Sequence, residues 1–309
     1  MPIFEPNSIK YLAIIAISIA LAVFVHPLLI LLWVVILLVD DVMYFRFQRT
    51  IFDSEIAIQR GYQFANIFLE DQSGAGRDLG FNVYDGDLQK TREQSQQDKW
   101  DFMIESLNLN AGDRLLDIGC GYGDWLNYAR SQGMEVMGVN ISPDQANEAR
   151  ANYDLEILNI NWKDIPASPA LQEQLYGKFD AVTFMDTIEH YVPSMYRKND
   201  EKLAEIYGSM FDMACELLKP DSDSGCVFIS CLHMTRDPET VWDDFACYLQ
   251  TRYHSGYYPK GDDGLTRYSG EYFQELARYD KTEDYRLTSV IDENHFGSPN
   301  IKWTPHKVG

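Results

Sequence analysis

Leu115 to Trp125 reads LLDIGCGYGDW and is the most informative stretch of the chain. An apolar run from Arg114 to Ile118 carries Asp117 near its end, and glycines follow at alternate positions, Gly119, Gly121 and Gly123. Glycine allows a tight turn and lets backbone N–H groups approach a ligand closely. A helix that begins directly after such a turn favours a negatively charged group at its N-terminus. The stretch predicts a strand, a glycine-rich binding turn and a helix.

The glycine spacing distinguishes this turn from two common nucleotide loops. Its DxGxGxG order lacks the GxGxxG spacing of dinucleotide-binding folds and the GKS or GKT ending of a P-loop. A plain tight turn between a strand and a helix is the alternative interpretation, because glycines alone are weak evidence for a ligand.

The residues around this turn alternate between strand and helix patterns. Helices are predicted from about Lys90 to Leu107, at Ser142–Asn152 and at Lys202–Leu218. The further predicted strands are Glu135–Val139, Leu155–Leu158, Phe179–Phe184 and Cys226–Leu232. Such alternation predicts an α/β fold with a doubly wound, mostly parallel sheet. In these sheets the ligand lies at the carboxyl ends of the strands, near the topological switch point.

The net charge of the chain argues against one class of binding partner. The 309 residues include 26 Lys and Arg against 47 Asp and Glu, a net charge of −21. A phosphate backbone would be repelled, so we expect no nucleic acid partner.

The five cysteines are odd in number and lack paired spacing, which favours free thiols in a reducing compartment. No CxxC or HExxH motif is present, so no metal site is expected.

An apolar segment near the N-terminus predicts a membrane anchor. The 29 residues from Tyr11 to Val39 contain no Asp, Glu, Lys or Arg. As a helix they would extend about 44 Å, which exceeds the ~30 Å hydrocarbon core. Because Pro27 interrupts the segment, one kinked span and a non-crossing hairpin both remain open. Arginines are more frequent after the segment than before it, which favours a catalytic body on the cytoplasmic side.

Four segments carry a family resemblance: LNLNAGDRLLDIGCGYG, VMGVNISPDQANEAR, FDAVTFMDTIEHY and VFISCLHMT. They resemble the cyclopropane fatty acid synthase-like methyltransferases, which include mycolic acid methyltransferases, fungal sphingolipid C-methyltransferases and plant alkaloid N-methyltransferases. The likeness runs from about Tyr62 to Trp303. It implies a Rossmann-like class I methyltransferase fold and methyl transfer from S-adenosylmethionine (SAM).

The resemblance also implies which residues hold SAM. Asp117, Gly119 and Gly121 would line its methionine end, with Cys120 and Gly123 in the same turn.

Four further residues after the second, third and fourth strands would complete the cofactor site. Asn140 and Gln145 match ribose-contacting positions. Trp162 matches the residue beside the adenine, although a core tryptophan is an equal alternative. Asp186 would lie at the mouth of the site, unless it is simply a loop carboxylate.

Three residues match the family's active-site positions. Glu189 matches a glutamate that can orient an acceptor, accept a proton or stabilise positive charge. His190 matches a histidine that serves as a base in the N-methylating branch. His233 matches a histidine that helps bind bicarbonate in the lipid-modifying members, where the bicarbonate takes the proton from the methylated alkene.

The chain departs from that lipid-modifying branch in three places. The family's Tyr-Ser-Cys segment corresponds to Asn82–Gly86, where Tyr84 or Asp85 would have to replace the cysteine. A conserved His-Tyr pair reads His295-Phe296. Bicarbonate-assisted cyclopropanation is therefore disfavoured, and a methyl branch is the expected product. The family also continues to a last antiparallel strand, so we expect truncation at Gly309.

These observations predict three regions: a membrane anchor at 1–45, a helical connector and active-site cover at 46–100, and a SAM-binding domain at 101–309. An insertion at about 236–270 is expected to form a lid, with a satellite core as the alternative. Its aromatic residues are Trp242, Phe245, Tyr248, Tyr253, Tyr257, Tyr258 and Tyr268.

The leading hypothesis is methyl transfer to a lipid, such as an unsaturated acyl chain, a sphingoid base or a sterol. N-methylation of a small amine and a non-catalytic SAM-binding protein are the alternatives. The sequence does not indicate an oligomeric state.

Overall fold

The computed structural model describes residues 80–193, 196–220, 225–234, 240, 258–270 and 272–288. The predicted anchor therefore lies outside the described residues. Two compact units divide the chain. The first contains Met1–Phe64, Ile188–Ser209 and Leu232–Tyr268, and the second contains Ala65–Thr187, Met210–Cys231 and Ser269–Gly309.

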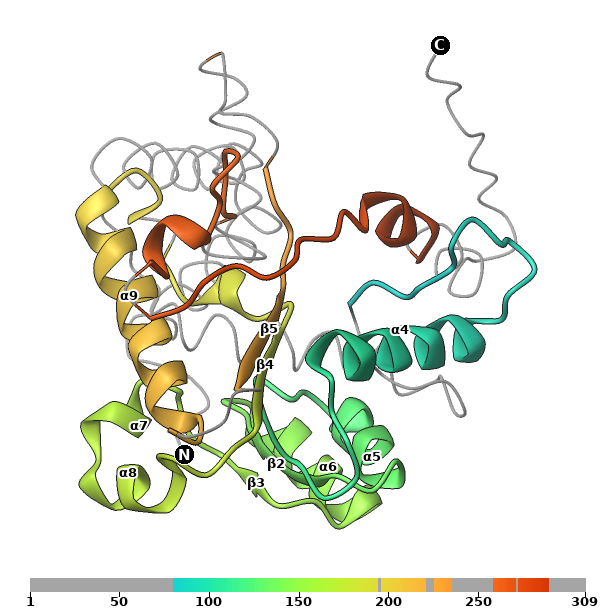
Figure 1. The fold of residues 1–309 in the computed structure, drawn as a ribbon, viewed down its shortest axis with the longest axis horizontal. Helices are drawn as coiled ribbons and strands as arrows, with labels where there is room; N and C mark the ends of the chain where they lie inside the picture. Colours follow the sequence, from blue (N-terminus) through green and yellow to red (C-terminus); the bar gives the residue numbers. More distant parts are fainter. Residues whose placement is uncertain are drawn as a thin grey trace, which may run out of the picture. The chain divides into compact units, whose positions relative to one another are not determined.

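The second unit contains a parallel sheet whose strands are hydrogen-bonded in the order β3-β2-β1-β4-β5; Figure 1 labels four of them, β2 to β5. Its strands are β1 (Arg114–Ile118), β2 (Glu135–Val139), β3 (Ile157–Leu158), β4 (Ala181–Met185) and β5 (Cys226–Ser230). The chain moves outward from β1 to β3 and then returns to β4 on the other side of β1. The topological switch point therefore lies between β1 and β4, and the predicted doubly wound parallel sheet is confirmed.

Helices connect these strands. They are α4 (Arg92–Leu107), α5 (Asp124–Ser131), α6 (Pro143–Tyr153), α7 (Asp164–Ala167), α8 (Pro169–Leu175) and α9 (Asp200–Leu217), with a further helical turn at 282–288. Right-handed crossovers put helices on opposite faces when the winding direction reverses. Accordingly, α5 and α6 lie on one side of the sheet, and α8 lies on the other (Figure 1).

Local sequence signals set the helix ends. Thr91 and Gln94 form a capping box at the start of α4, each side chain bonding the other's backbone N–H. Ser142 caps α6 ahead of a proline in the first turn. Asn108 and Asp154 end these two helices in the left-handed conformation, which Asn and Asp adopt at lower cost than most residues.

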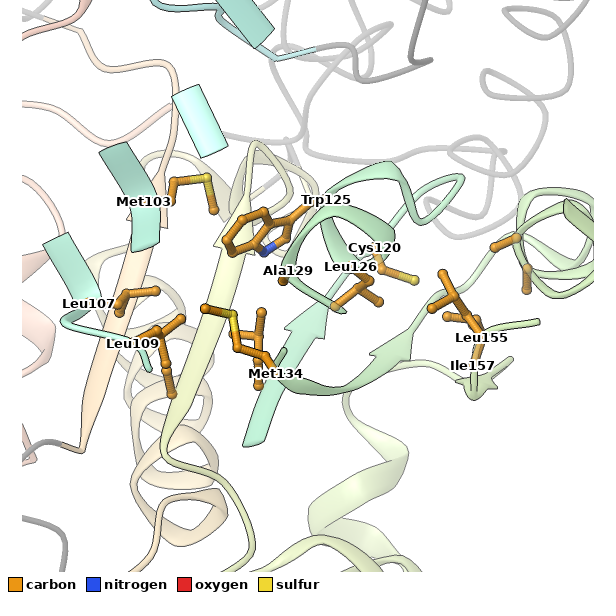
Figure 2. Close-up of a cluster of buried hydrophobic side chains, with 14 residues drawn as sticks. Met103, Leu107, Leu109, Cys120, Trp125, Leu126, Ala129, Met134, Leu155 and Ile157 are labelled. Atoms are coloured by element: carbon orange, nitrogen blue, oxygen red, sulfur yellow. The ribbon is translucent and has the colours of Figure 1, made fainter. Parts of the chain in front are cut away.

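A buried cluster joins α4 and α5 to the sheet. Met103 and Leu107 of α4 pack with Trp125 and Leu126 of α5, and Leu115 of β1 completes the contact. Figure 2 shows these α4 and α5 side chains together with residues of the β2–β3 region. This packing fixes α5 against the sheet, and α5 is the helix that follows the glycine turn.

Three predicted strand boundaries were wrong. The third strand is only Ile157–Leu158, because β3 pairs with β2 at just Gly138 and Val139. The fourth begins at Ala181 rather than Phe179, since Phe179 bridges to Leu218 instead. The fifth ends at Ser230, where its pairing with Met185 of β4 ends.

Among the described residues, no helix is long and apolar enough to span a membrane.

Replacing Leu126 tests the packing of α5. Its side chain is fully buried, so Leu126→Ala should lower the free energy of unfolding by about 2–5 kcal/mol through a cavity. Leu88, 63% exposed, provides a matched control, and Leu88→Ala should change that energy by no more than about 0.5 kcal/mol. Urea denaturation of both variants measures the difference; equal effects would show that α5 does not pack as described.

Candidate functional site

Asp117 lies in β1 directly before the glycine turn and is almost fully buried. Its Oδ1 accepts a hydrogen bond of 2.7 Å from the Thr183 hydroxyl of β4. The same hydroxyl accepts one of 3.3 Å from Trp125 Nε1 of α5. Together these bonds fix the carboxylate between the two strands that flank the switch point. Thr183 was not predicted; its sole signal in the sequence is a polar residue inside an apolar strand.

The three glycines of the turn have positive φ angles of 90°, 53° and 82° at Gly119, Gly121 and Gly123. A Cβ on Gly119 would collide with the Thr187 methyl group, and one on Gly123 would lie 2.6 Å from Leu155 Cδ1. A Cβ on Gly121 would meet nothing within 4 Å. The outer two glycines are therefore required by packing, whereas Gly121 presents its backbone to open space.

Cys120 occupies the turn but directs its sulfur into the protein. Its Sγ would lie 2.6 Å from a Cβ on Gly138 of β2, and the residue belongs to the core cluster. Burial, followed by the nearby Asp117 carboxylate, raises the pKa of this thiol well above its usual range. The thiol therefore stays protonated, and a ligand in the turn would contact only the backbone here. The described part of the chain contains no disulfide.

Asn140 follows β2 and links the turn to α6. Its Nδ2 donates to the Gly121 carbonyl at 2.9 Å and to Gln145 Oε1 at 3.1 Å, and its Oδ1 accepts from the Ser142 N–H. The structure thus places Asn140 and Gln145 in direct contact. Both donors of the Asn140 amide are used within the protein, so its visible role is to hold the turn. Asn159, which sequence reasoning missed, donates to the Asn140 carbonyl at 2.8 Å.

Trp162 comes after β3 and is 7% exposed. Lys163 places its ammonium 5.6 Å from the centre of the Trp162 ring. The tryptophan is therefore largely packed into the protein while lying on the β3 side of the same sheet edge, which is compatible with both interpretations of its role.

Asp186 lies just after β4, in the left-handed conformation with φ 48°. Its N–H donates to the Ser230 carbonyl, and its Oδ1 accepts from the Ser230 hydroxyl at 2.9 Å. A Cβ on Gly80 would collide with Asp186 Oδ2 and lie 3.0 Å from Lys99 Nζ. The buried Lys99 and the half-buried Asp186 therefore approach the same point beside Gly80. None of the residues Gly80, Lys99 and Ser230 was predicted.

Asn82–Gly86 of the same unit correspond in sequence to the family's Tyr-Ser-Cys segment. Asp85 is exposed, and its carboxylate lies 3.7 Å from Lys90 Nζ and 3.5 Å from Lys281 Nζ. Tyr84 is fully buried. His295 and Phe296 lie outside the described residues.

Glu189, His190 and His233 belong to the first unit. Glu189 is 3% exposed, and its Oε1 accepts a 2.6 Å hydrogen bond from the Leu232 N–H. This bond brings Glu189 next to the residue that precedes His233, so two of the three predicted catalytic residues are neighbours. His233 is exposed, with Nε2 3.0 Å from the Gly261 carbonyl. His190 is half-buried and ends the short 3-10 helix η1 (Ile188–His190).

Two aromatic contacts bear on this unit. The Tyr207 hydroxyl of α9 donates to the Ile188 carbonyl at 3.3 Å and so holds η1 in place. Tyr207 also stacks on Tyr268 of η3 (Thr266–Tyr268), with ring centres 5.4 Å apart.

Of the predicted lid aromatics, only Tyr258 and Tyr268 are described, and both are packed rather than exposed. That arrangement fits a satellite core at these two positions.

A model of the mycolic acid cyclopropane synthetase family matches residues 54–247. The chain belongs to this family, as the four sequence segments predicted. Among curated proteins, it is 32% identical over 143 residues to a probable fatty acid methyltransferase of Pseudomonas putida, covering 43% of this chain and 34% of the relative. It is 31% identical over 111 residues to a sphingolipid C9-methyltransferase of Candida albicans, covering 33% and 21%. The chain thus spans about a third or less of these relatives.

Solved structures share the fold. The cyclopropane synthase MmaA2 of Mycobacterium tuberculosis aligns with a TM-score of 0.60 and 18% identity over 80% of this chain and 86% of that one. The mycolic acid cyclopropane synthase CmaA1, solved with S-adenosylhomocysteine (SAH), aligns with a TM-score of 0.55 and 17% identity over 79% and 84%. These neighbours confirm the Rossmann-like methyltransferase fold.

Two glycine variants distinguish a glycine that leaves room for the cofactor from one that is required by packing. Gly121→Ala adds a methyl group to open space, so we expect affinity for SAH to fall at least about tenfold, a change of ~1.4 kcal/mol. Gly119→Ala should instead mainly lower the melting temperature, because its methyl group collides with Thr187. Calorimetric titration and thermal melting of both variants test this; unchanged SAH affinity in Gly121→Ala would mean that no cofactor lies over the turn.

Proposed function

We propose that this protein is a SAM-dependent methyltransferase that acts on a lipid acceptor at a membrane. The observation that carries the proposal is the family match over residues 54–247, which includes both the glycine turn and Glu189. The structure supports it by bringing Asp117, the glycine turn and Asn140 together at the carboxyl ends of β1 and β2.

The residues at this edge fit SAM. Gly121 leaves space above the turn, and Asn140 and Gln145 hold the adjoining loop at the end of β2. When bound, SAM supplies an electrophilic methyl group on a positively charged sulfur. Asp117, kept in position by Thr183, places a buried negative charge beneath the turn, which favours a cationic ligand. The turn's backbone and these side chains would orient the cofactor, and orientation is a large part of catalysis in such displacements.

Glu189 is proposed as the residue that handles charge on the acceptor. Methylation of an alkene leaves a carbocation that must lose a proton, and methylation of an amine also releases one. A buried carboxylate can stabilise that positive charge or accept the proton. Its bond from the Leu232 N–H uses Oε1 and sets the orientation of the group.

A lipid acceptor is favoured by the relatives named as fatty acid and sphingolipid methyltransferases and by the apolar segment at Tyr11–Val39. An anchor would raise the local concentration of the enzyme at a bilayer substrate. We further propose that the catalytic body faces the cytoplasm and that the product is a methyl branch. The sequence supports the latter, because Asn82–Gly86 contains no cysteine where the family has its Tyr-Ser-Cys segment.

The proposal is tested with full-length protein, methyl-labelled SAM, total membrane lipid and a panel of small amines, each with and without bicarbonate. We expect label in the lipid fraction independent of bicarbonate. Label in amines alone would contradict the lipid acceptor and support the N-methyltransferase alternative. Bound SAM with no label in any acceptor would support the non-catalytic alternative.

Glu189→Gln should reduce kcat by about 10²–10⁴ while leaving SAH affinity unchanged. The amide oxygen can still accept the bond from the Leu232 N–H, so the fold should be preserved. Glu205→Gln makes the same chemical change on the exposed surface of α9 and should have wild-type kcat. Equal rates for both variants would exclude Glu189 from the reaction.

A further inference from the structure

A chain of two hydrogen bonds connects the residues on either side of the glycine turn through the neighbouring strand. Asp117 precedes the turn, Trp125 follows it in the first turn of α5, and Thr183 lies in β4. Trp125 Nε1 lies 3.3 Å from the Thr183 hydroxyl oxygen, and that oxygen lies 2.7 Å from Asp117 Oδ1. The three residues are 5%, 0% and 2% exposed for Trp125, Thr183 and Asp117, so water hardly competes for these bonds.

The chemistry of the three groups sets the direction of both bonds. An indole N–H can only donate a hydrogen bond, and an ionised carboxylate can only accept one. A hydroxyl has one proton to donate and lone pairs that accept. Because the Trp125 N–H donates to the Thr183 oxygen, the Thr183 proton is directed at Asp117. The two bonds therefore run in one direction, from α5 through β4 to β1.

The register of the sheet puts Thr183 directly beside Asp117. The two residues are partners in the parallel pairing of β1 with β4, so their side chains lie on the same side of the sheet. Leu115 shares that side, being two residues before Asp117, and it belongs with Trp125 to the buried cluster under α5. Figure 2 shows the Trp125 indole in this cluster, with its nitrogen in blue. The α5 side of the sheet thus brings all three polar groups together.

We propose that Thr183 and Trp125 are positioning residues that orient the Asp117 carboxylate for cofactor binding. Thr183 holds the carboxylate directly, and Trp125 acts through Thr183. A hydrogen bond to an ionised acceptor is stronger than one between neutral groups, so the hydroxyl is an effective restraint on this side chain. The inference rests on the proposed function, in which the buried charge of Asp117 favours a cationic ligand.

The same two bonds also restrain the glycine turn as a whole. Asp117 and Trp125 lie at opposite ends of it, and a single oxygen of β4 bonds to both. The turn backbone that faces the ligand is therefore held at both ends by a residue that is distant in the sequence. Loss of the Thr183 hydroxyl would release both ends together.

Thr183→Val tests the chain, because valine keeps the branched shape of the side chain and removes only the hydroxyl. SAH carries an ammonium group that a carboxylate can attract, whereas 5′-methylthioadenosine keeps the adenosine and the thioether without that group. We expect SAH affinity to fall about tenfold in Thr183→Val, with 5′-methylthioadenosine affinity at the wild-type value. Thr183→Ser retains the hydroxyl and should bind SAH as the wild type does.

Thr282→Val is the matched control. The Thr282 hydroxyl also bonds to a carboxylate, that of Asp280, but both residues are exposed. The substitution therefore makes the same chemical change away from the sheet. It should alter the affinity for neither ligand.

Trp125→Phe tests the second bond, because it removes the N–H and leaves an aromatic ring in the cluster. Alone, it should lower SAH affinity about threefold. In the Thr183→Val background it should cause no further loss, since the indole N–H has no hydroxyl through which to act. Losses that multiply in the double variant would overturn the role given to Trp125.

Calorimetric titration and thermal melting of the full-length proteins distinguish the outcomes. Equal losses for both ligands in Thr183→Val would overturn the inference, because a general packing defect affects both. Unchanged SAH affinity, or a Thr183→Ser variant as weak as Thr183→Val, would also overturn it. If Thr183→Val does not fold, the presence or absence of a selective loss of SAH in Trp125→Phe decides. Wild-type protein that binds neither ligand would instead contradict the proposed function itself.

Discussion

The close contact between Gly119 and Thr187 is the constraint on which the rest of the sheet edge depends. Glycine is needed at position 119 because any side chain there would occupy the space of the Thr187 methyl group. The φ angle of 90° at this position also disfavours any other residue. The contact joins the ends of β1 and β4, which are the two strands at the topological switch point. The Thr187 hydroxyl also donates to the Ile118 carbonyl at 3.3 Å, so the same residue holds the backbone at the start of the glycine turn.

Elsewhere in the second unit, a small number of side-chain hydrogen bonds hold the polar groups of the candidate site in position. Thr183 holds Asp117, Asn140 holds the Gly121 carbonyl, and Ser230 holds Asp186. Each bond connects neighbouring strands or their following loops, so the position of one polar group depends on the pairing of the sheet. In the first unit, Glu189 is fixed in a similar way by the backbone of the segment after β5. Buried polar groups fixed in advance are the usual basis of electrostatic catalysis.

Local sequence was sufficient for most of the fold. β1 and β2 have the predicted bounds because each is a short apolar run with turn residues on either side. The glycine turn was predicted for the same reason, because its residues are close in sequence. Asn140 and Gln145 were assigned from the family resemblance, and the structure shows a hydrogen bond between them. The missed features depend on distant contacts. Thr288 and Asp284 bond to backbone 206 and 200 residues away, and no local pattern indicates that pairing. Lys99 of α4 is completely buried, which nothing in its local sequence indicates.

The central claim is that SAM lies along the carboxyl ends of β3, β2, β1 and β4. Hydrogen–deuterium exchange of the full-length protein with and without saturating SAH tests it most directly. The account predicts slower exchange at the backbone amides of 117–123 and 140–145, with no change in α8. Slower exchange confined to other segments, or none at all with SAH present, would contradict it.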